Sequence, residues 1–259
     1  MNDSTWTGRH RFFIAPEGID GDVVRFDREQ SHQLTRVLRL HMREPLVVLT
    51  GDNQEYLVEL VEIHPKATRA RIVDRRPAQG NPGLAISLYQ ALLPRERFEL
   101  ALTKSTEVGI ARFVPLRTQR TVARIQEHDW MSREKRLQAL AREASEQSER
   151  PRIPSIGAPI EFSNAVHQAC AEGPTLIAWE RADTSLDRNE LCELAHDPRR
   201  IVSVLVGPEG GFTPDEISAA EGLGARLLWL GPRILRAETA GVVIASILLY
   251  ESGDLGFSS

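Results

Sequence analysis

The second part of the chain alternates short apolar runs with helix-like segments, and this alternation constrains the fold more than any other feature. From residue 82 onward, runs rich in Val, Leu and Ile, such as "LAISLYQAL", "PTLIAWE" and "IVSVLV", are each followed by a segment of helical character. Strands of this kind are buried on both faces and are typical of parallel sheets covered by helices. We therefore expect an α/β domain with a parallel sheet over residues 77–259.

The first 76 residues follow a different pattern. Strand-like runs alternate with turns ("RFFI", "DVVRF", "PLVVLTG", "YLVELVEI" and "TRARIVD"), and one helix-like piece, "EQSHQLTRVLRLHMR", lies among them. The stretch "RRPAQGNPG" then gathers Pro, Gly and Asn, as linkers do. We expect a small β-rich domain over residues 1–76.

Composition excludes several classes of protein. With 259 residues and a net charge of -4, the chain has no overall basic character, so any nucleic-acid surface must be a local patch. The N-terminus lacks the apolar core of a signal peptide, and "AGVVIASILLY" is too short to span a bilayer, so we expect a cytoplasmic protein without a membrane partner. Cys170 and Cys192 lie far apart without a neighbouring His cluster, and indicate neither a metal site nor a disulfide.

Two glycine loops follow apolar runs near the end of the chain. In "LVGPEGGFTPDEI", Thr213 is placed to cap a helix, with Pro214 at its first position and Glu216 in capping-box register. Gly210 and Gly211 would allow positive φ and close approach of a ligand. The second loop, "LGPRILRAETAGVVIAS", also leaves an apolar run and enters a helix. Loops at the carboxyl ends of neighbouring parallel strands form the crevice where open α/β sheets bind ligands.

The loops do not match the common phosphate-binding motifs. A P-loop requires Lys-Ser/Thr after its last glycine, and the dinucleotide fingerprint requires G-x-G-x-x-G. A tight turn without a ligand would explain one such loop. Two in succession favour a pocket lined by main-chain N–H and C=O groups, which suits an adenine and a small zwitterion.

These two loops resemble those of the RsmE family of 16S ribosomal RNA uridine-N3 methyltransferases, in the SPOUT superfamily. The segments "SHQLTRVLRL", "KSTEVGIARFVPL", "EASEQSERPRIP" and "LIAWE" agree with that family and occur in its order. The resemblance implies a trefoil-knotted parallel-sheet domain, an N-terminal PUA-like β-barrel that binds RNA, and a homodimer that acts on 16S rRNA in the assembled 30S subunit. It also implies S-adenosyl-L-methionine (SAM) as the cofactor.

Carried over by motif, the resemblance places the cofactor between the two loops. The implied binding residues are Leu205, Gly207, Gly211, Leu230, Gly231, Ile234, Leu235 and Arg236. Trp179 and Glu180, which end the preceding strand, are further candidates for the wall of the pocket.

A basic stripe is expected in the small domain. If "SHQLTRVLRLHMR" forms one helix, His32, Arg36, Arg39 and Arg43 fall in a narrow sector, opposite the apolar Leu34, Val37, Leu38 and Leu40. Such a stripe is often only a solvated helix face. Because Arg9 and Arg11 are nearby in sequence and the family resemblance implies RNA binding, we interpret five residues as phosphate contacts: Arg9, Arg11, His32, Arg36 and Arg39.

Methylation of uridine N3 removes a proton and places negative charge on the neighbouring carbonyl oxygens, which an arginine would stabilise. Arg236 and Arg233 are the candidates for this catalytic role. Glu238 could interact with its helix terminus or orient an arginine, and Glu209 could act as a base or anchor backbone N–H groups. Lys104 and Glu107 form a helix-surface pair by default, and Arg120 could be functional or structural. Ribose 2′-O methylation and a non-catalytic RNA-binding role are the alternatives.

Overall fold

The computed structural model describes residues 6, 9–51, 53–123, 127–180 and 186–256. The chain forms two compact units, the first comprising residues 1–81 and 145–152, and the second residues 82–144 and 153–259. The expected boundary after residue 76 is therefore early, and residues 145–152 belong to the first unit. Glu146 shows why, since its Oε1 accepts a hydrogen bond of 3.0 Å from the main-chain N–H of Phe13. A partner so distant in sequence leaves no local pattern.

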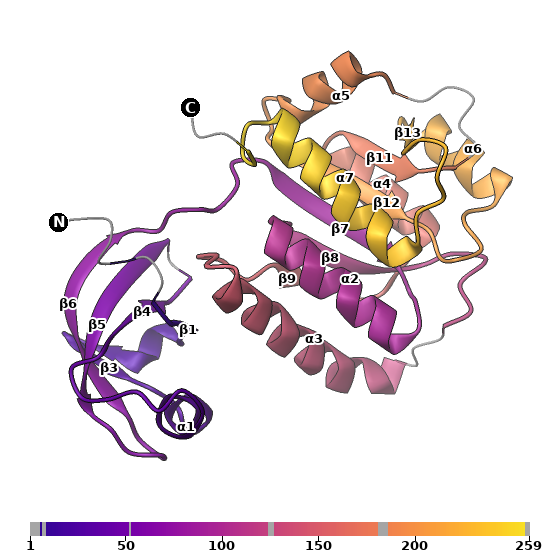
Figure 1. Ribbon diagram of the computed structural model, residues 1–259. Coiled ribbons are helices and arrows are strands. Elements are labelled where there is room, and N and C mark those ends of the chain that lie inside the picture. Colours follow the sequence, from indigo (N-terminus) through magenta and orange to yellow (C-terminus); the bar gives the residue numbers. More distant parts are fainter. Residues whose placement is uncertain (1–5, 7–8, 52, 124–126, 181–185, 257–259) are drawn as a thin grey trace. The chain divides into compact units, whose positions relative to one another are not determined.

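The second unit contains a seven-stranded sheet whose pairs are all parallel, as the sequence predicts (Figure 1). The strand order is β10-β8-β7-β12-β11-β13, and β9 pairs with β8. The strands are β7 (Ala85–Ala91), β8 (Arg112–Arg117), β9 (Ser155–Ile156), β10 (Ile160–Glu161), β11 (Thr175–Ala178), β12 (Ile201–Val206) and β13 (Arg226–Leu228). This order places the two strands that precede the glycine loops, β12 and β13, on either side of β11.

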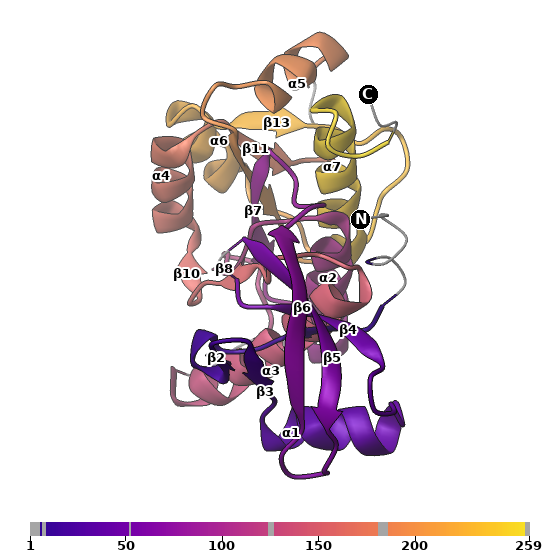
Figure 2. The same cartoon turned by 90° about the vertical axis from the view of Figure 1, so that its left-hand side faces the viewer.

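Helices cover both faces of this sheet. They are α2 (Arg95–Val108), α3 (Glu127–Gln147), α4 (Phe162–Glu172), α5 (Arg188–Ala195), α6 (Pro214–Gly222) and α7 (Ala237–Glu251). Figure 2 shows α4 and α6 on one side of the strands, with α2 and α7 on the other. Within the described residues, no helix combines the length and apolar character needed to cross a membrane.

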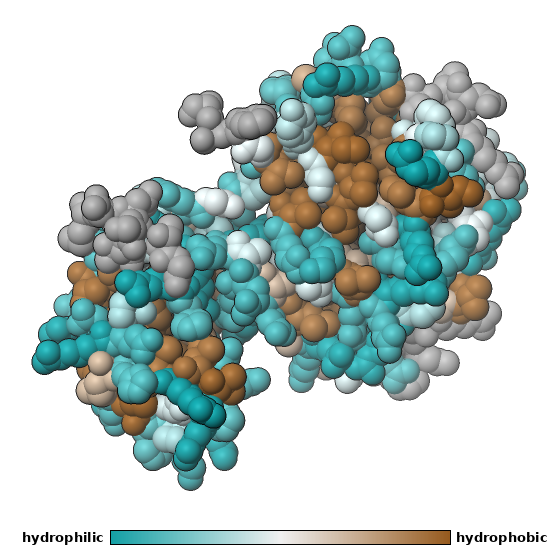
Figure 3. Space-filling view, viewed as in Figure 1, coloured by the Kyte–Doolittle hydropathy of each residue, from teal (hydrophilic) through white to brown (hydrophobic). Residues whose placement is uncertain are grey.

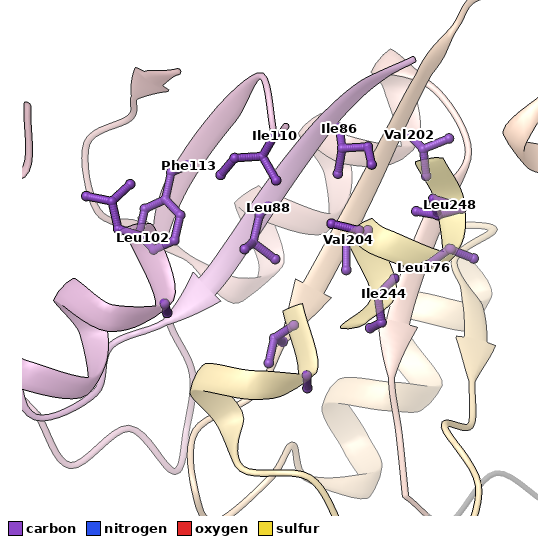
Figure 4. Packing of buried hydrophobic residues seen from close by; sticks show 14 of the residues in the cluster. Ile86, Leu88, Leu102, Ile110, Phe113, Leu176, Val202, Val204, Ile244 and Leu248 are labelled. Atoms are coloured by element: carbon purple, nitrogen blue, oxygen red, sulfur yellow. The ribbon is translucent and has the colours of Figure 1, made fainter. Parts of the chain in front are cut away.

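Alternation along each strand directs neighbouring side chains into two separate cores. Val204 and Leu88 pack in the cluster that includes Leu102 of α2 and Ile244 of α7 (Figure 4). Leu205, the next residue along β12, packs in the opposite cluster with residues of α4 and α6. Fully buried strands therefore produce the near-continuous apolar runs seen in the sequence.

The first unit contains a six-stranded sheet of order β1-β4-β5-β6-β3-β2. Its strands are β1 (Arg11–Phe13), β2 (Ile19–Asp20), β3 (Val23–Arg25), β4 (Pro45–Leu49), β5 (Gln54–Glu62) and β6 (Arg69–Pro77). β1 and β4 are parallel and the other neighbours are antiparallel. This unit has its own core, in which Phe12 and Phe26 meet edge to face. The predicted β-rich character of this part of the chain is confirmed.

The helix expected over the basic stripe is shorter than the sequence predicts. It consists of α1 (Arg28–His32), capped by Asp27, and a π-helical turn, η3 (Gln33–Val37). Arg39 then adopts a left-handed φ of 55°, and the Leu40 N–H bonds back to the Leu34 carbonyl. The chain reverses here because Leu40 must return to the core before β4 begins.

Several members of the predicted stripe are therefore placed differently. Arg39 and Arg43 lie beyond the helix, and Val37, expected to pack, is 65% exposed. The four basic side chains are nevertheless exposed: His32, Arg36, Arg39 and Arg43.

Candidate functional site

The first glycine loop, residues 207–213, leaves β12 and folds back on itself. The Gly211 N–H donates to the Pro208 carbonyl, and Gly211 has a φ of 67°. A Cβ at Gly207 would lie 3.3 Å from the Gly211 carbonyl carbon and from the Phe212 ring, tighter than most real contacts. The expected positive φ is confirmed for Gly211, whereas Gly210 is not among the left-handed glycines.

The predicted cap of the following helix is present. The Thr213 hydroxyl accepts from the Glu216 N–H at 3.2 Å, and Glu216 Oε2 accepts from the Thr213 N–H at 2.8 Å. The other oxygen of Glu216 accepts from the Gln119 N–H at 2.9 Å. One buried carboxylate thus fixes the end of the first loop and joins it to the turn after β8.

Arg120, in that same turn, holds the first loop directly. Its Nη1 donates to the carbonyl oxygens of Gly210 at 2.8 Å and Phe212 at 3.1 Å. The sequence left open whether Arg120 is functional or structural; the contacts show a guanidinium that supports the loop main chain. A planar group with several fixed donors suits this role better than an ammonium would.

The second loop, residues 229–236, runs from β13 to α7. Gly231 has a φ of 94°, which a glycine tolerates and other residues adopt rarely. Arg236 is the N-cap residue of α7. Much of the loop surface is open, since Ile234 is 86% exposed and the Arg236 side chain is 78% exposed.

The two loops enclose a cavity of about 560 Å³, called here the strand-end cavity. Its floor includes the last residues of three adjacent strands, Ala178 of β11, Val206 of β12 and Leu228 of β13. This volume lies within the usual range for small-molecule sites. The position, at the carboxyl ends of parallel strands, is the one expected for a ligand crevice.

Most residues predicted for the site line this cavity. They are Gly207, Gly211, Leu230, Gly231, Ile234, Leu235 and Arg236, together with Arg233, Trp179 and Glu180. Leu205 is the exception, because its side chain is fully buried in the core on the other face of the sheet. Its neighbour Val206 lines the cavity instead.

The charged side chains around the cavity differ in whether they form ion pairs. Arg97 of α2 lines it and forms an ion pair of 2.9 Å with Glu209 of the first loop. Glu209 is therefore held in a partly exposed ion pair. Arg233 has no ion-pair partner among the described residues. Sequence reasoning missed Arg97, although its place just after β7, beside β12, could have indicated it.

Among the described residues, Glu238 is the one buried carboxylate of the cavity wall, with 7% of its surface exposed. Its Oε2 has no hydrogen-bond partner among the described residues. Its Oε1 lies 3.9 Å from Arg236 Nη1. The sequence offered an electrostatic role for Glu238 at the helix terminus, but the pattern of residues gave no indication of its burial.

Outside the cavity, two expectations can be compared with the structure. Lys104 and Glu107 form the expected surface pair on α2, at 2.8 Å. Arg11 is buried, with its side chain only 4% exposed, and its Nη1 lies 2.8 Å from Glu55 Oε1. The interpretation of Arg11 as a phosphate contact is therefore wrong, because its charge is already neutralised inside the first unit.

Comparison with known proteins identifies the family of this chain. The sequence model of the RNA methyltransferase domain matches residues 80–249. Ribosomal RNA small subunit methyltransferase E from Synechocystis is 32% identical over 243 residues, covering 93% of this chain and 78% of the relative. The protein of the same name from Mesomycoplasma hyopneumoniae is 29% identical over 211 residues, covering 82% of this chain and 88% of the relative.

Solved structures show the same architecture. A methyltransferase from Legionella pneumophila, in complex with the cofactor SAM, has a TM-score of 0.85 and 29% identity, covering 93% of this chain and 97% of the other. Ribosomal RNA small subunit methyltransferase E from Neisseria gonorrhoeae, bound to SAM, has a TM-score of 0.81 and 26% identity, with the same coverage. The resemblance drawn from the glycine loops is confirmed, and the chain belongs to the ribosomal RNA small subunit methyltransferase E family of RNA methyltransferases.

Proposed function

We propose that this protein is a SAM-dependent methyltransferase that modifies N3 of a uridine in the decoding region of 16S ribosomal RNA. The observation that carries the proposal is the strand-end cavity, lined by two glycine loops at the carboxyl ends of β12 and β13, the parallel strands on either side of β11. Two relatives are named as methyltransferases of the ribosomal RNA of the small subunit, and two structural neighbours bind SAM.

The residues present fit SAM. The tight backbone around Gly207 and Gly211 offers main-chain donors and acceptors at close range, which suits an adenine ring. Leu230 and Leu235 add apolar surface, and the orphaned oxygen of Glu238 offers an acceptor for a nitrogen that carries hydrogen. Bound SAM would supply a methyl group on a positively charged sulfur.

Arg233 and Arg236 are placed to contact the second substrate, the uridine. Both line the cavity, and the Arg236 guanidinium is largely exposed. When N3 of a uridine loses its proton, negative charge develops on the O2 and O4 carbonyl oxygens. A guanidinium that donates to these oxygens stabilises that charge and orients N3 toward the methyl carbon. We assign this role to Arg236 and Arg233.

The first unit supplies the surface for RNA, and we retain the PUA-like barrel and the knot of the second unit as parts of this proposal. Arg36 and Arg39 are exposed, and a hollow of about 460 Å³ is lined by Arg28, Glu29, His32, Pro65 and Lys66. Exposed arginine and lysine side chains bind phosphates without reading sequence. Arg9, whose Nε is buried without a hydrogen-bond partner among the described residues, remains a candidate.

We further propose that the enzyme is a cytoplasmic homodimer that acts on the assembled 30S subunit. Figure 3 shows hydrophobic residues gathered where α7 lies in Figure 1. Ile234, before this helix, and Tyr250, near its end, are 86% and 52% exposed. Apolar surface of this kind favours association with a second copy.

Mass spectrometry of nucleosides tests the reaction. 30S subunits from a strain lacking the protein are incubated with purified protein and isotopically labelled SAM. We expect labelled 3-methyluridine. Label in a 2′-O-methylnucleoside would overturn the N3 assignment while keeping SAM as the methyl donor, and SAM binding without labelled RNA would favour a non-catalytic RNA-binding protein.

A further inference from the structure

Glu238 differs from the other buried acids of this protein. Three glutamates are buried among the described residues, at positions 55, 216 and 238. Glu55 lies 2.8 Å from Arg11 and 2.9 Å from Arg76, and Glu216 accepts hydrogen bonds from two main-chain N–H groups and so satisfies both of its oxygens. Only Glu238 keeps an oxygen without a donor within the described part of the chain.

The surroundings of Glu238 do not supply the missing donor. Arg236 Nη1 lies 3.9 Å from Oε1, beyond hydrogen-bond distance, and its side chain is 78% exposed. The first turn of α7 favours a negative charge through its dipole. A dipole, however, does not provide the hydrogen bond that Oε2 lacks, and a buried carboxylate without one is costly to maintain.

Glu238 is among the residues that line the strand-end cavity, so a ligand in that cavity can provide the donor. A carboxylate bonds most strongly to a donor that is itself charged. SAM carries one such group, the ammonium of its amino-acid portion. Its sulfonium is charged but has no hydrogen to donate, and its adenine amine donates but is neutral.

We propose that Glu238 accepts a hydrogen bond from the ammonium group of SAM and thereby selects ligands that carry an amino-acid portion. This inference rests on SAM being the cofactor. It gives Glu238 a binding role that is distinct from the main-chain contacts of the glycine loops.

Isothermal titration calorimetry with three ligands tests the assignment. SAM carries the ammonium and the sulfonium, S-adenosylhomocysteine keeps the ammonium but loses the sulfonium charge, and 5′-methylthioadenosine lacks the amino-acid portion. We expect Glu238→Gln to weaken SAM and S-adenosylhomocysteine by about 10- to 100-fold, the range of a charge-assisted hydrogen bond. The affinity for 5′-methylthioadenosine should stay within about twofold of wild type, a change of less than about 0.5 kcal/mol.

Two controls accompany the titrations. Glu107→Gln removes one negative charge at an exposed pair on α2, and should leave the affinity for all three ligands unchanged. Without ligand, Glu238→Gln should unfold at the same temperature as wild type or a higher one, since the amide removes an unpaired buried charge. Retained binding of 5′-methylthioadenosine would show that the cavity of the variant is folded.

The outcomes separate this inference from the proposed cofactor. Wild-type protein that binds none of the ligands would overturn the use of SAM itself. Wild-type protein that binds SAM, with equal affinity in Glu238→Gln, would overturn the role of Glu238 alone. Equal weakening of all three ligands would also overturn it, because the contact would then be to the adenine or to the fold. Weakening of SAM without weakening of S-adenosylhomocysteine would reject the ammonium in favour of the sulfonium charge.

Discussion

Gly211 tests whether the first glycine loop binds the cofactor in the conformation seen in the structure. Its φ is 67°, in the left-handed region. There an ordinary side chain costs about 1–2 kcal/mol and a β-branched one costs more. A Cβ at this position would lie 3.5 Å from Glu180 Oε1, an ordinary contact distance. The perturbation is therefore strain in the backbone and not a collision.

With a side chain at residue 211, the loop can relieve this strain by adopting another conformation. The cavity then loses the wall that this loop forms. A cost of about 1–2 kcal/mol corresponds to roughly 5- to 30-fold weaker binding, which we expect for Gly211→Ala. Gly211→Val should bring SAM binding below detection. The fold should persist, because Gly211 lies in a loop and the cores on both sides of the sheet stay intact.

Calorimetry with SAM measures the affinity, and circular dichroism during heating measures the fold. Gly222→Ala is the matched control, since this glycine ends α6 and a Cβ there would meet no atom within 4 Å. If Gly211→Val bound SAM as tightly as wild type, the first loop would not contact the cofactor. A parallel fall in affinity and unfolding temperature would attribute the effect to misfolding.

Three further predictions concern the loop support, the RNA surface and pH. Arg120→Ala should weaken SAM binding about tenfold in calorimetry, because it removes two hydrogen bonds to loop carbonyls. Arg120→Lys should weaken it less, and the control Arg117→Ala on β8 should leave the affinity for SAM unchanged. Arg36→Ala combined with Arg39→Ala should lower the slope of log affinity for RNA against log salt by about 2 and leave SAM binding unchanged; an unaltered slope would remove both residues from the phosphate contacts. The hydrogen bond from Arg136, with help from Arg95, lowers the pKa of Glu99 from 4.5 to about 2. Glu99 therefore stabilises the fold above pH 4.5 and loses that effect as the pH falls toward 2, so the difference in unfolding temperature between wild type and Glu99→Gln should narrow over that range. A constant difference would contradict the ionic role of Glu99.

The sequence predicted most of the second unit because its signals are local. Buried strands appear as apolar runs such as that of β12, and the cap of α6 depends on four consecutive residues, Thr213 to Glu216. The helix after Asp27 shows the limit of periodicity. A periodicity of 100° per residue does not indicate where a helix ends. Here the helix ends because burial of Leu40 requires the chain to reverse at Arg39.

The site was predictable where main-chain conformation is encoded by glycine, as at Gly211 and Gly231. It was not predictable where a side chain acts across the fold. Arg120 meets the loop carbonyls from a turn about 90 residues earlier, and Arg11 is neutralised by Glu55, which lies 44 residues away. Neither contact leaves a pattern in the nearby sequence. The sequence therefore suggested that Arg11 was an unpaired cation, and it left open whether Arg120 is functional or structural.

Under the proposed function, different groups of the strand-end cavity bind the two substrates. The cavity wall that we propose for SAM includes two loops, whose conformation depends on left-handed glycines and on the Arg120 contacts. The exposed Arg236 guanidinium, and Arg233 beside it in sequence, remain available for the anion that forms on the uridine. Loop glycines should therefore control SAM affinity, whereas the two arginines should control turnover. Glu238 is the exception to this division, because it is a buried side chain of the cavity wall that we propose to contact SAM, and for that reason its substitution should change which SAM analogues bind and not how the RNA is held.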